Sequence, residues 1–108
     1  MIALVLLAGA LGAVLRYLCS LWLPKPWGVL LVNVVGSFIA GLALASLSGD
    51  WQLVALTGFC GGLTTFSTFS VETVQAAVDG AWKRAVLSVG LNLVLGIGAA
   101  ALGYALLA

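Results

Sequence analysis

Residues 61–70 read GGLTTFSTFS, two glycines followed by five hydroxyl side chains and two phenylalanines, with no charge among them. Each glycine costs a helix roughly 1 kcal/mol relative to alanine. Serine and threonine hydroxyls bond back to carbonyls one turn earlier, which often bends a helix. The stretch therefore predicts a break in a segment that is otherwise apolar and helical.

The composition indicates that lipid surrounds most of this chain. Of its 108 residues, 64% are hydrophobic, four are basic and three are acidic, whereas a soluble domain carries about 25% charged residues. A net charge of +1 favours neither nucleic acid nor an acidic partner. The sequence has no histidine and no group of acids at metal-ligand spacing. Most zinc, haem and Ser/His/Asp chemistry is therefore excluded, and we expect no enzyme activity.

The two cysteines and the first apolar run have ordinary interpretations. Cys19 and Cys60 lie far apart inside apolar stretches, where a lone thiol usually behaves as a small buried hydrophobe. The first apolar run has no basic segment before it and continues to Arg16, which is longer than the apolar part of a signal peptide. We therefore expect free thiols and a first span that is retained.

Four segments are long and apolar enough to cross a membrane, for which a helix needs about 20 residues. They cover residues 2–22, 28–47, 52–78 and 85–107. Short connections with proline, glycine or aspartate separate them, and all four tryptophans lie at span ends, where the headgroup level favours them. The sequence predicts an all-α fold, with residues 1–108 forming a single four-span domain of the plasma (inner) membrane.

Small and polar residues mark one face of the second span. Asn33, Ser37 and Gly41 recur every four residues, which places them on one side of a helix. Gly58 and Gly62 in the third span have the same spacing, and small residues of this kind let helix backbones approach closely. A carboxamide inside a membrane span needs hydrogen-bond partners, because lipid supplies none. Asn33 therefore marks either a helix–helix hydrogen bond or a path for a solute.

The stretch at residues 61–70 lies near the middle of the third span. A break there frees carbonyls that lipid cannot satisfy, and a bound cation is one way to satisfy several together. Phe66 and Phe69, three residues apart, share a face of the helix that resumes after the break. Because aromatic rings have a positive edge, rings set edge-on to a narrow path favour an anion. The residues predict either an ion path or a broken packing helix.

Three motifs together resemble the Fluc (CrcB) family of fluoride channels. They are GALGAVLRY at residues 9–17, NVVGSFIAG at residues 33–41 and GGLTTFSTFS at residues 61–70. The resemblance covers essentially the whole chain. It implies a fluoride-selective ion channel that lets fluoride leave the cytoplasm down its gradient and so confers fluoride resistance. It also implies an antiparallel, dual-topology dimer with two pores along the interface and a broken third helix.

The resemblance assigns residues to the pore. Phe66 and Phe69 correspond to the phenylalanines that line the two pores. Asn33 corresponds to the pore asparagine of the second span. Ser67 and Thr68 correspond to the hydroxyl groups beside the rings.

The resemblance also implies one structural cofactor and several further positions. The backbone carbonyls of Gly61 and Thr64, from both subunits, would hold a central sodium ion that is not transported. Arg16 matches the arginine of the first span, whose simplest role is anchoring of a helix end by snorkelling. Further residues have open roles: Glu72, Ser88 and Asn92.

The charge distribution keeps two assemblies open. With alternating spans, Arg16, Lys25, Lys83 and Arg84 all fall toward one side of the membrane, and the other side holds no lysine or arginine. The positive-inside rule then favours one orientation, with both termini outside, whereas an antiparallel homodimer needs copies inserted both ways. The chain is therefore either a dual-topology homodimer, which we favour slightly, or one half of an antiparallel heterodimer with a related chain.

The main competing function is that of a small multidrug exporter, which is also a four-span chain of this length. Proton-coupled export needs a titratable acid deep in the bundle. The first and second spans contain no acid, and Glu72 lies toward the far end of the third. The sequence therefore favours the fluoride channel over the exporter.

Overall fold

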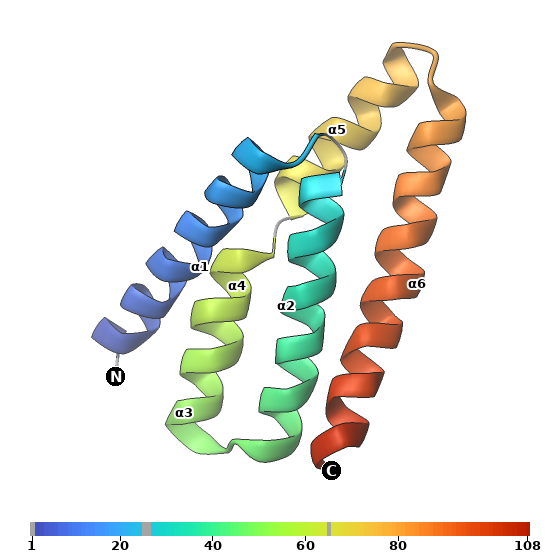
Figure 1. Cartoon of the computed structure of the whole chain (residues 1–108). Helices are drawn as coiled ribbons and strands as arrows, with labels where there is room; N and C mark the ends of the chain where they lie inside the picture. The colour runs from blue at the N-terminus through green and yellow to red at the C-terminus, as the bar shows by residue number, and fades with distance from the viewer. Residues whose placement is uncertain (1, 25–26, 65) are drawn as a thin grey trace.

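The computed structural model describes residues 2–24, 27–64 and 66–108, without the side chains of residues 66–68. The elements in chain order are α1 (Ile2–Trp22), α2 (Trp27–Ser46), α3 (Gly49–Leu53), the π-helical segment η1 (Val54–Cys60), α4 (Gly61–Leu63), α5 (Phe66–Val78) and α6 (Trp82–Leu107). Within these ranges there is no β-strand (Figure 1). The predicted all-α class is confirmed.

The helices form a flat bundle. α2 and α6 run side by side in the same direction and make the most extensive packed pair, while α1 packs against η1 and α4, and α5 packs on α6 (Figure 1). Both chain ends lie toward the lower end of the bundle in Figure 1. The principal extents are 46 × 29 × 19 Å, so the bundle is about two helix diameters thick.

The outside of the bundle is apolar. α1, α2 and α6 are each long and apolar enough to cross a membrane, and they occupy the first, second and fourth predicted spans. Large aliphatic side chains face outward along them, with Leu6 67% and Ile97 69% exposed, whereas Val32 is the one fully enclosed large side chain in the described ranges. An apolar surface of this extent suits hydrocarbon rather than water.

Glycines allow the helices to approach closely at two interfaces. A Cβ atom added to Gly41 on α2 would overlap the carbonyl oxygen of Ala100 on α6. A Cβ atom added to Gly62 on α4 would overlap the carbonyl oxygen of Gly9 on α1, and Gly58, one turn earlier, also lies against α1. The prediction that these small residues mediate helix packing is confirmed.

The third predicted span, residues 52–78, is built from several helical pieces. The chain winds as α3, widens into the π-helical η1, and returns to α geometry in α4. Helical geometry stops at Thr64, whose ψ of 154° is extended, and it resumes in α5. A π-helical segment of this kind is rare and occurs frequently near functional sites.

The helix stops at the first hydroxyl residue of the motif rather than at its glycines. Gly61 and Gly62 are themselves helical, because the contact of Gly62 with α1 offsets the low helix propensity of glycine. The Thr64 hydroxyl donates to the Cys60 carbonyl at 2.8 Å, which confirms the predicted back-bonding at this residue. The thiols of Cys60, buried, and Cys19, half-buried, are both free as expected.

A glycine turn joins α5 to α6 and fixes where the basic residues lie. Gly80 has a φ of 82°, a left-handed value that glycine adopts readily. Its amide donates to the Ala77 carbonyl at 3.1 Å, and the Ala81 amide donates to the Ala76 carbonyl at 2.8 Å. This is the Schellman pattern of helix termination. It reverses the chain so that α6 begins beside the end of α5.

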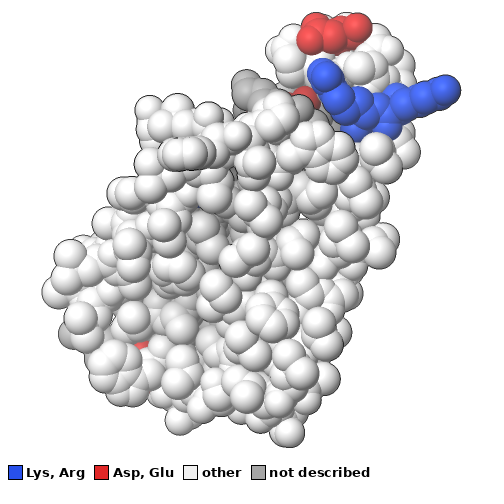
Figure 2. Space-filling model, in the orientation of Figure 1, with Lys and Arg blue, Asp and Glu red and all other residues white. Residues whose placement is uncertain are grey.

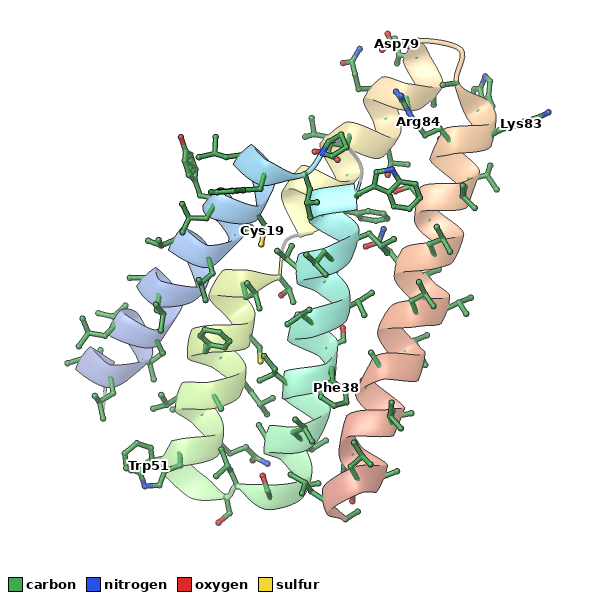
Figure 3. The ribbon with its side chains drawn as sticks, in the orientation of Figure 1. Cys19, Phe38, Trp51, Asp79, Lys83 and Arg84 are labelled. Atoms are coloured by element: carbon green, nitrogen blue, oxygen red, sulfur yellow. The ribbon has the colours of Figure 1, made fainter. Side chains whose placement is uncertain are left out.

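The basic side chains visible on one face gather at one end of the bundle. The blue Lys and Arg atoms in Figure 2 lie at the upper end, where Figure 3 labels Lys83 and Arg84 beside the turn that carries Asp79. Trp51, the residue just before the third predicted span, lies at the opposite end (Figure 3). α1, which carries Arg16, runs toward the same end as the α5–α6 turn (Figure 1). Lys25 lies outside the described residues.

Candidate functional site

Two carboxamides meet between α2 and α6. The Asn33 side-chain amide, Nδ2, donates a hydrogen bond to the Asn92 carboxamide oxygen, Oδ1, at 2.9 Å. Both side chains are partly buried. With a rise of 1.5 Å per residue, Asn33 lies about 9 Å and Asn92 about 15 Å into its helix. The helix–helix hydrogen bond that the sequence offered as one role for Asn33 is therefore present.

The Asn33–Asn92 contact is one of three successive contacts between α2 and α6. Asn33, Ser37 and Gly41 face positions of α6 that also recur every four residues. The Ser37 hydroxyl lies 3.5 Å from the point where Gly96 would carry a Cβ atom, and Gly41 meets Ala100. Since α2 and α6 run in the same direction, equal spacing on both helices keeps the two stripes in register.

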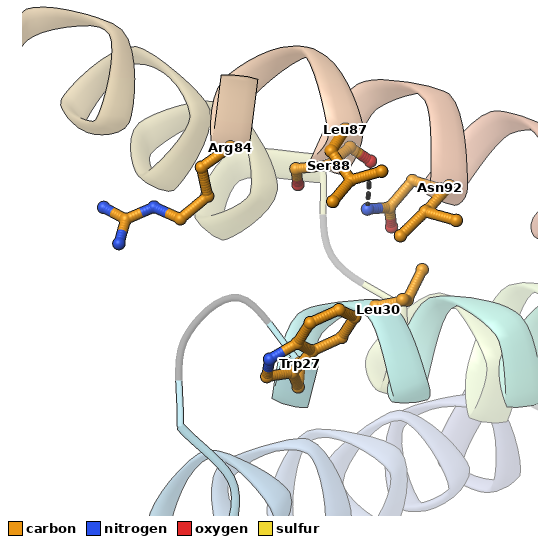
Figure 4. A pocket seen from close by; sticks show the side chains of 7 residues that line it. Trp27, Leu30, Arg84, Leu87, Ser88 and Asn92 are labelled. Carbon is orange, nitrogen blue, oxygen red and sulfur yellow. Dashed lines mark hydrogen bonds between the residues drawn. The ribbon is translucent and has the colours of Figure 1, made fainter. Parts of the chain in front are cut away.

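Asn92 is held in place by its own helix as well. Its amide, Nδ2, donates to the Ser88 carbonyl at 2.8 Å, drawn as a dashed line in Figure 4. The Asn92 carboxamide thus accepts from α2 and donates to α6, which fixes its plane. Ser88, one turn earlier, is the one buried polar residue in the described ranges, with 9% of its surface exposed.

A cavity of about 140 Å³ is lined at one end by Asn92, the acceptor of this pair. It is lined from α2 by Trp27 and Leu30, and from α6 by Arg84, Leu87, Ser88, Leu91 and Asn92. Ser88 and Asn92 lie along the edge of α6 that faces Trp27 and Leu30 (Figure 4). Arg84 lies at the other end, with its guanidinium directed away from Asn92 (Figure 4). The cavity therefore has the charged residue Arg84 at one end and the carboxamide of Asn92 at the other.

A second cavity, of about 220 Å³, lies between α5 and α6. Its lining comes from α5 through Val71, Glu72, Thr73, Gln75 and Ala76, and from α6 through Arg84 and Ser88. Within the described part of the chain, Glu72 Oε1 and Thr73 Oγ1 are buried and have no hydrogen-bond partner. Arg84 and Ser88 thus border both cavities.

The predicted pore residues of the third span are only partly placed. The side chains of Phe66, Ser67 and Thr68 lie outside the described residues, and their assignment stays a prediction. Phe69 is half-buried on α5, and α5 packs on α6. The helix that carries the predicted pore rings therefore lies beside the helix that carries Asn92.

The two residues predicted to hold sodium lie where α4 ends. Gly61 is exposed and Thr64 is half-buried. A Cβ atom added to Gly61 would meet only its own helix, at 3.6 Å from the Leu56 carbonyl oxygen. The Thr64 methyl group packs against Gly36 of α2. The last carbonyls of a helix have no partner within it. The end of α4 therefore presents carbonyl oxygens, which can act as cation ligands, near an exposed face.

The remaining predicted residues separate into two groups. Glu72, Ser88 and Asn92, whose roles the sequence left open, each border at least one of the two cavities. Arg16 is half-buried on α1 and is not among the residues that line either cavity.

Sequence reasoning missed Arg84 and Trp27 as parts of this site. The signal for Arg84 is present in the sequence, because Arg84, Ser88 and Asn92 recur every four residues and so share one face of a helix. Trp27 was interpreted only as a headgroup-level residue. Its place across the cavity depends on how α2 packs against α6.

Comparisons with known proteins cover nearly the whole chain. The pattern of the CrcB-like protein family, described also as Camphor Resistance (CrcB), matches residues 3–104. The chain is 48% identical to the fluoride-specific ion channel FluC of Bordetella petrii, over 94% of this chain and 86% of that protein. It is 45% identical to FluC 1 of Nocardia farcinica, over 91% and 74%, and 45% identical to FluC of Acidobacterium capsulatum, over 92% and 89%.

Proposed function

This chain belongs to the CrcB-like protein family, and from that membership we propose that it is a fluoride-selective channel that lets fluoride leave the cytoplasm. The resemblance inferred from three short motifs is confirmed by the family match. The chain is a multi-pass protein of the inner membrane, with several apolar helices of spanning length. Outward flow down the fluoride gradient would lower the internal concentration and protect the cell.

The observation that carries the proposal is the Asn33–Asn92 pair at the end of a cavity between two membrane-length helices. Fluoride is small and strongly hydrated, so a path through lipid must replace its water with closely placed hydrogen-bond donors. A carboxamide carries N–H donors, and the bond to Asn92 holds the Asn33 carboxamide in one orientation. Polar residues at this depth mark solute paths in membrane proteins.

We assign the pore to residues from three helices. Asn33 from α2 and Phe66, Ser67, Thr68 and Phe69 from the start of α5 would contact the ion. Positive ring edges and hydroxyl donors suit a small anion that carries its full charge. Ser88 and Asn92 of α6 line the cavity beside this set, and we assign Asn92 the role of positioning the Asn33 carboxamide.

We propose that two copies, or this chain and a related one, form an antiparallel dimer around a structural sodium ion. The carbonyls of Gly61 and Thr64 fit such an ion, since a hard cation prefers oxygen ligands and α4 ends there. Gly61 is exposed and meets nothing but its own helix, so a second subunit can approach it. Sodium would supply positive charge near the anion path.

The distribution of basic residues bears on which of the two assemblies forms. Basic residues at one end of the bundle favour one orientation, which is the arrangement expected of a heterodimer half. A weak bias permits insertion both ways, which is the arrangement expected of a homodimer. We favour the homodimer, because Arg16 lies within a predicted span and adds little to the bias.

Reconstitution tests the proposed function directly. Purified protein is placed in liposomes loaded with potassium fluoride, and efflux is followed with a fluoride electrode after valinomycin is added as a potassium shunt. We expect fluoride efflux that depends on valinomycin, with no comparable efflux from liposomes loaded with chloride. Well-folded protein that releases no fluoride, alone or with a related partner chain, would show the proposal to be wrong.

A further inference from the structure

Among the described residues, Arg84 is the one charged residue that borders both cavities of the site. It lies in the first turn of α6 and is exposed. It borders the cavity that leads to Asn92 and also the cavity that holds Glu72. Residues 84, 88 and 92 share one face of α6. A solute that passes from the charged end toward Asn33 therefore meets Arg84, then Ser88, then Asn92.

The Arg84 guanidinium has no acidic partner among the described residues. Glu72 borders the same cavity from α5, and its buried Oε1 atom has no described hydrogen-bond partner. Asp79, the acid of the nearby turn, accepts a hydrogen bond from Gln75 at 3.0 Å. Structural ion pairing therefore does not account for the guanidinium at this place.

We propose that Arg84 is the anion-capturing residue at the mouth of the path that ends at the Asn33–Asn92 pair. The inference rests on the proposed function and adds a residue that raises the local fluoride concentration before the ion is dehydrated. A guanidinium is always charged and is more weakly hydrated than an ammonium group, so it attracts an anion without holding it tightly. Charge at a cleft with low-dielectric walls raises association rates for ions of opposite sign.

The expected size of the effect follows from the distances along α6. Arg84 and Asn92 are eight residues apart, or about 12 Å along the helix. At such a separation and in partly aqueous surroundings, one unit charge changes the local concentration of a monovalent ion by about three- to tenfold. The effect must weaken with salt, because the screening length falls from about 30 Å at 0.01 M to about 10 Å at 0.1 M.

Lys83 provides a matched control. It is the neighbouring residue, is also exposed, and carries the same charge. It borders a different depression, shared with Trp82, Val86 and Leu87, and lines neither cavity of the site. Removal of its charge changes the net charge of the chain by the same amount but leaves the mouth of the path intact.

The test measures unitary fluoride current in planar bilayers for the wild type, Arg84→Gln, Arg84→Lys and Lys83→Gln. Fluoride activity is held constant, and ionic strength is varied with an impermeant salt from about 0.01 to 0.3 M, which spans the range over which screening sets in. At low ionic strength, Arg84→Gln should lower the current about three- to tenfold, Arg84→Lys should retain most of it, and Lys83→Gln should change it less than twofold. The difference between Arg84→Gln and wild type should shrink at high salt. Size-exclusion profiles identical to wild type confirm that the variants assemble.

If the wild-type chain conducts fluoride, three results would overturn the inference. The first is an equal current in Arg84→Gln and wild type at low salt. The second is an equal loss of current in Arg84→Gln and Lys83→Gln, because that result would show that surface charge acts regardless of its position. A loss that does not depend on salt would assign Arg84 to packing. A wild-type chain without fluoride current would overturn the proposed function and this inference together, so the two failures are distinguishable.

Discussion

The Asn33 side chain of α2 donates a hydrogen bond to the Asn92 side chain of α6 at 2.9 Å. This bond joins two residues that are 59 positions apart in the chain, and it holds Asn33 against Asn92, which lines a cavity between α2 and α6. Its role in conduction is testable, because a positioning role and a direct role give different results when both side chains are removed.

We expect Asn33→Ala to lower fluoride flux about tenfold or more, since a hydrogen bond to a charged group contributes about 1.5–3 kcal/mol. Asn92→Ala should cause a smaller loss, because it releases the Asn33 carboxamide without removing it. The double variant should then lose no more than Asn33→Ala alone. The measurement is fluoride efflux from liposomes. Losses that multiply in the double variant would contradict the coupling.

Phe66→Ile and Phe69→Ile should each abolish or sharply reduce fluoride flux while the dimer stays assembled. Isoleucine retains most of the apolar volume but has no ring edge to present to an anion. Phe38→Ile, on α2 away from the predicted pore, is the matched control and should conduct like wild type. Normal efflux from both pore variants would show that the ring-edge mechanism is wrong.

Gly41→Ala should destabilise the bundle, whereas Gly98→Ala should not. A Cβ atom at Gly41 would overlap the Ala100 carbonyl oxygen, whereas one at Gly98 meets nothing within 4 Å. Overpacking costs about 1–3 kcal/mol, while alanine in an open helical position improves helix propensity by up to about 1 kcal/mol. Thermal unfolding in detergent, followed by circular dichroism, measures both. Equal unfolding temperatures would contradict the close α2–α6 packing.

Removal of sodium should weaken the proposed dimer. A ligand that binds only the assembled state stabilises it by about 2.7 kcal/mol at 100 times its Kd. Exchange of sodium for N-methylglucamine should therefore increase the monomer fraction in size-exclusion chromatography, and sodium added back should reverse the change. A monomer–dimer balance that does not respond to sodium would contradict the site at Gly61 and Thr64.

Labelling of an introduced cysteine can separate the two assemblies. Ser48 is exposed between α2 and α3, and Trp51 of α3 lies at the opposite end of the bundle from Lys83 (Figure 3). A Ser48→Cys variant that lacks Cys19 and Cys60 should react with an impermeant maleimide from both sides of the membrane if the chain has dual topology. Reaction from one side only would contradict the homodimer and favour a heterodimer half.

Local sequence patterns determined the class of the protein and the composition of its candidate site. Length, apolar content and the position of the tryptophans predicted helices in a membrane. In lipid every backbone N–H and C=O group must find a partner within the protein, and a helix provides those partners within one segment. The motifs at residues 9–17, 33–41 and 61–70 identified the family, which the comparison confirmed. The count of four spans, the sodium ion and the dimer stay predictions.

Tertiary structure decided which of these residues meet. Periodicity places Asn33, Ser37 and Gly41 on one face of α2, but it cannot say which helix that face contacts. The parallel register of α2 and α6 pairs Asn33 with Asn92. The same register brings Trp27 across from Arg84 and leaves Lys83 outside the path. Contact of Gly62 with α1 keeps the two glycines helical and moves the end of the helix to Thr64. These features depend on packing between segments far apart in the chain, which local propensity does not encode.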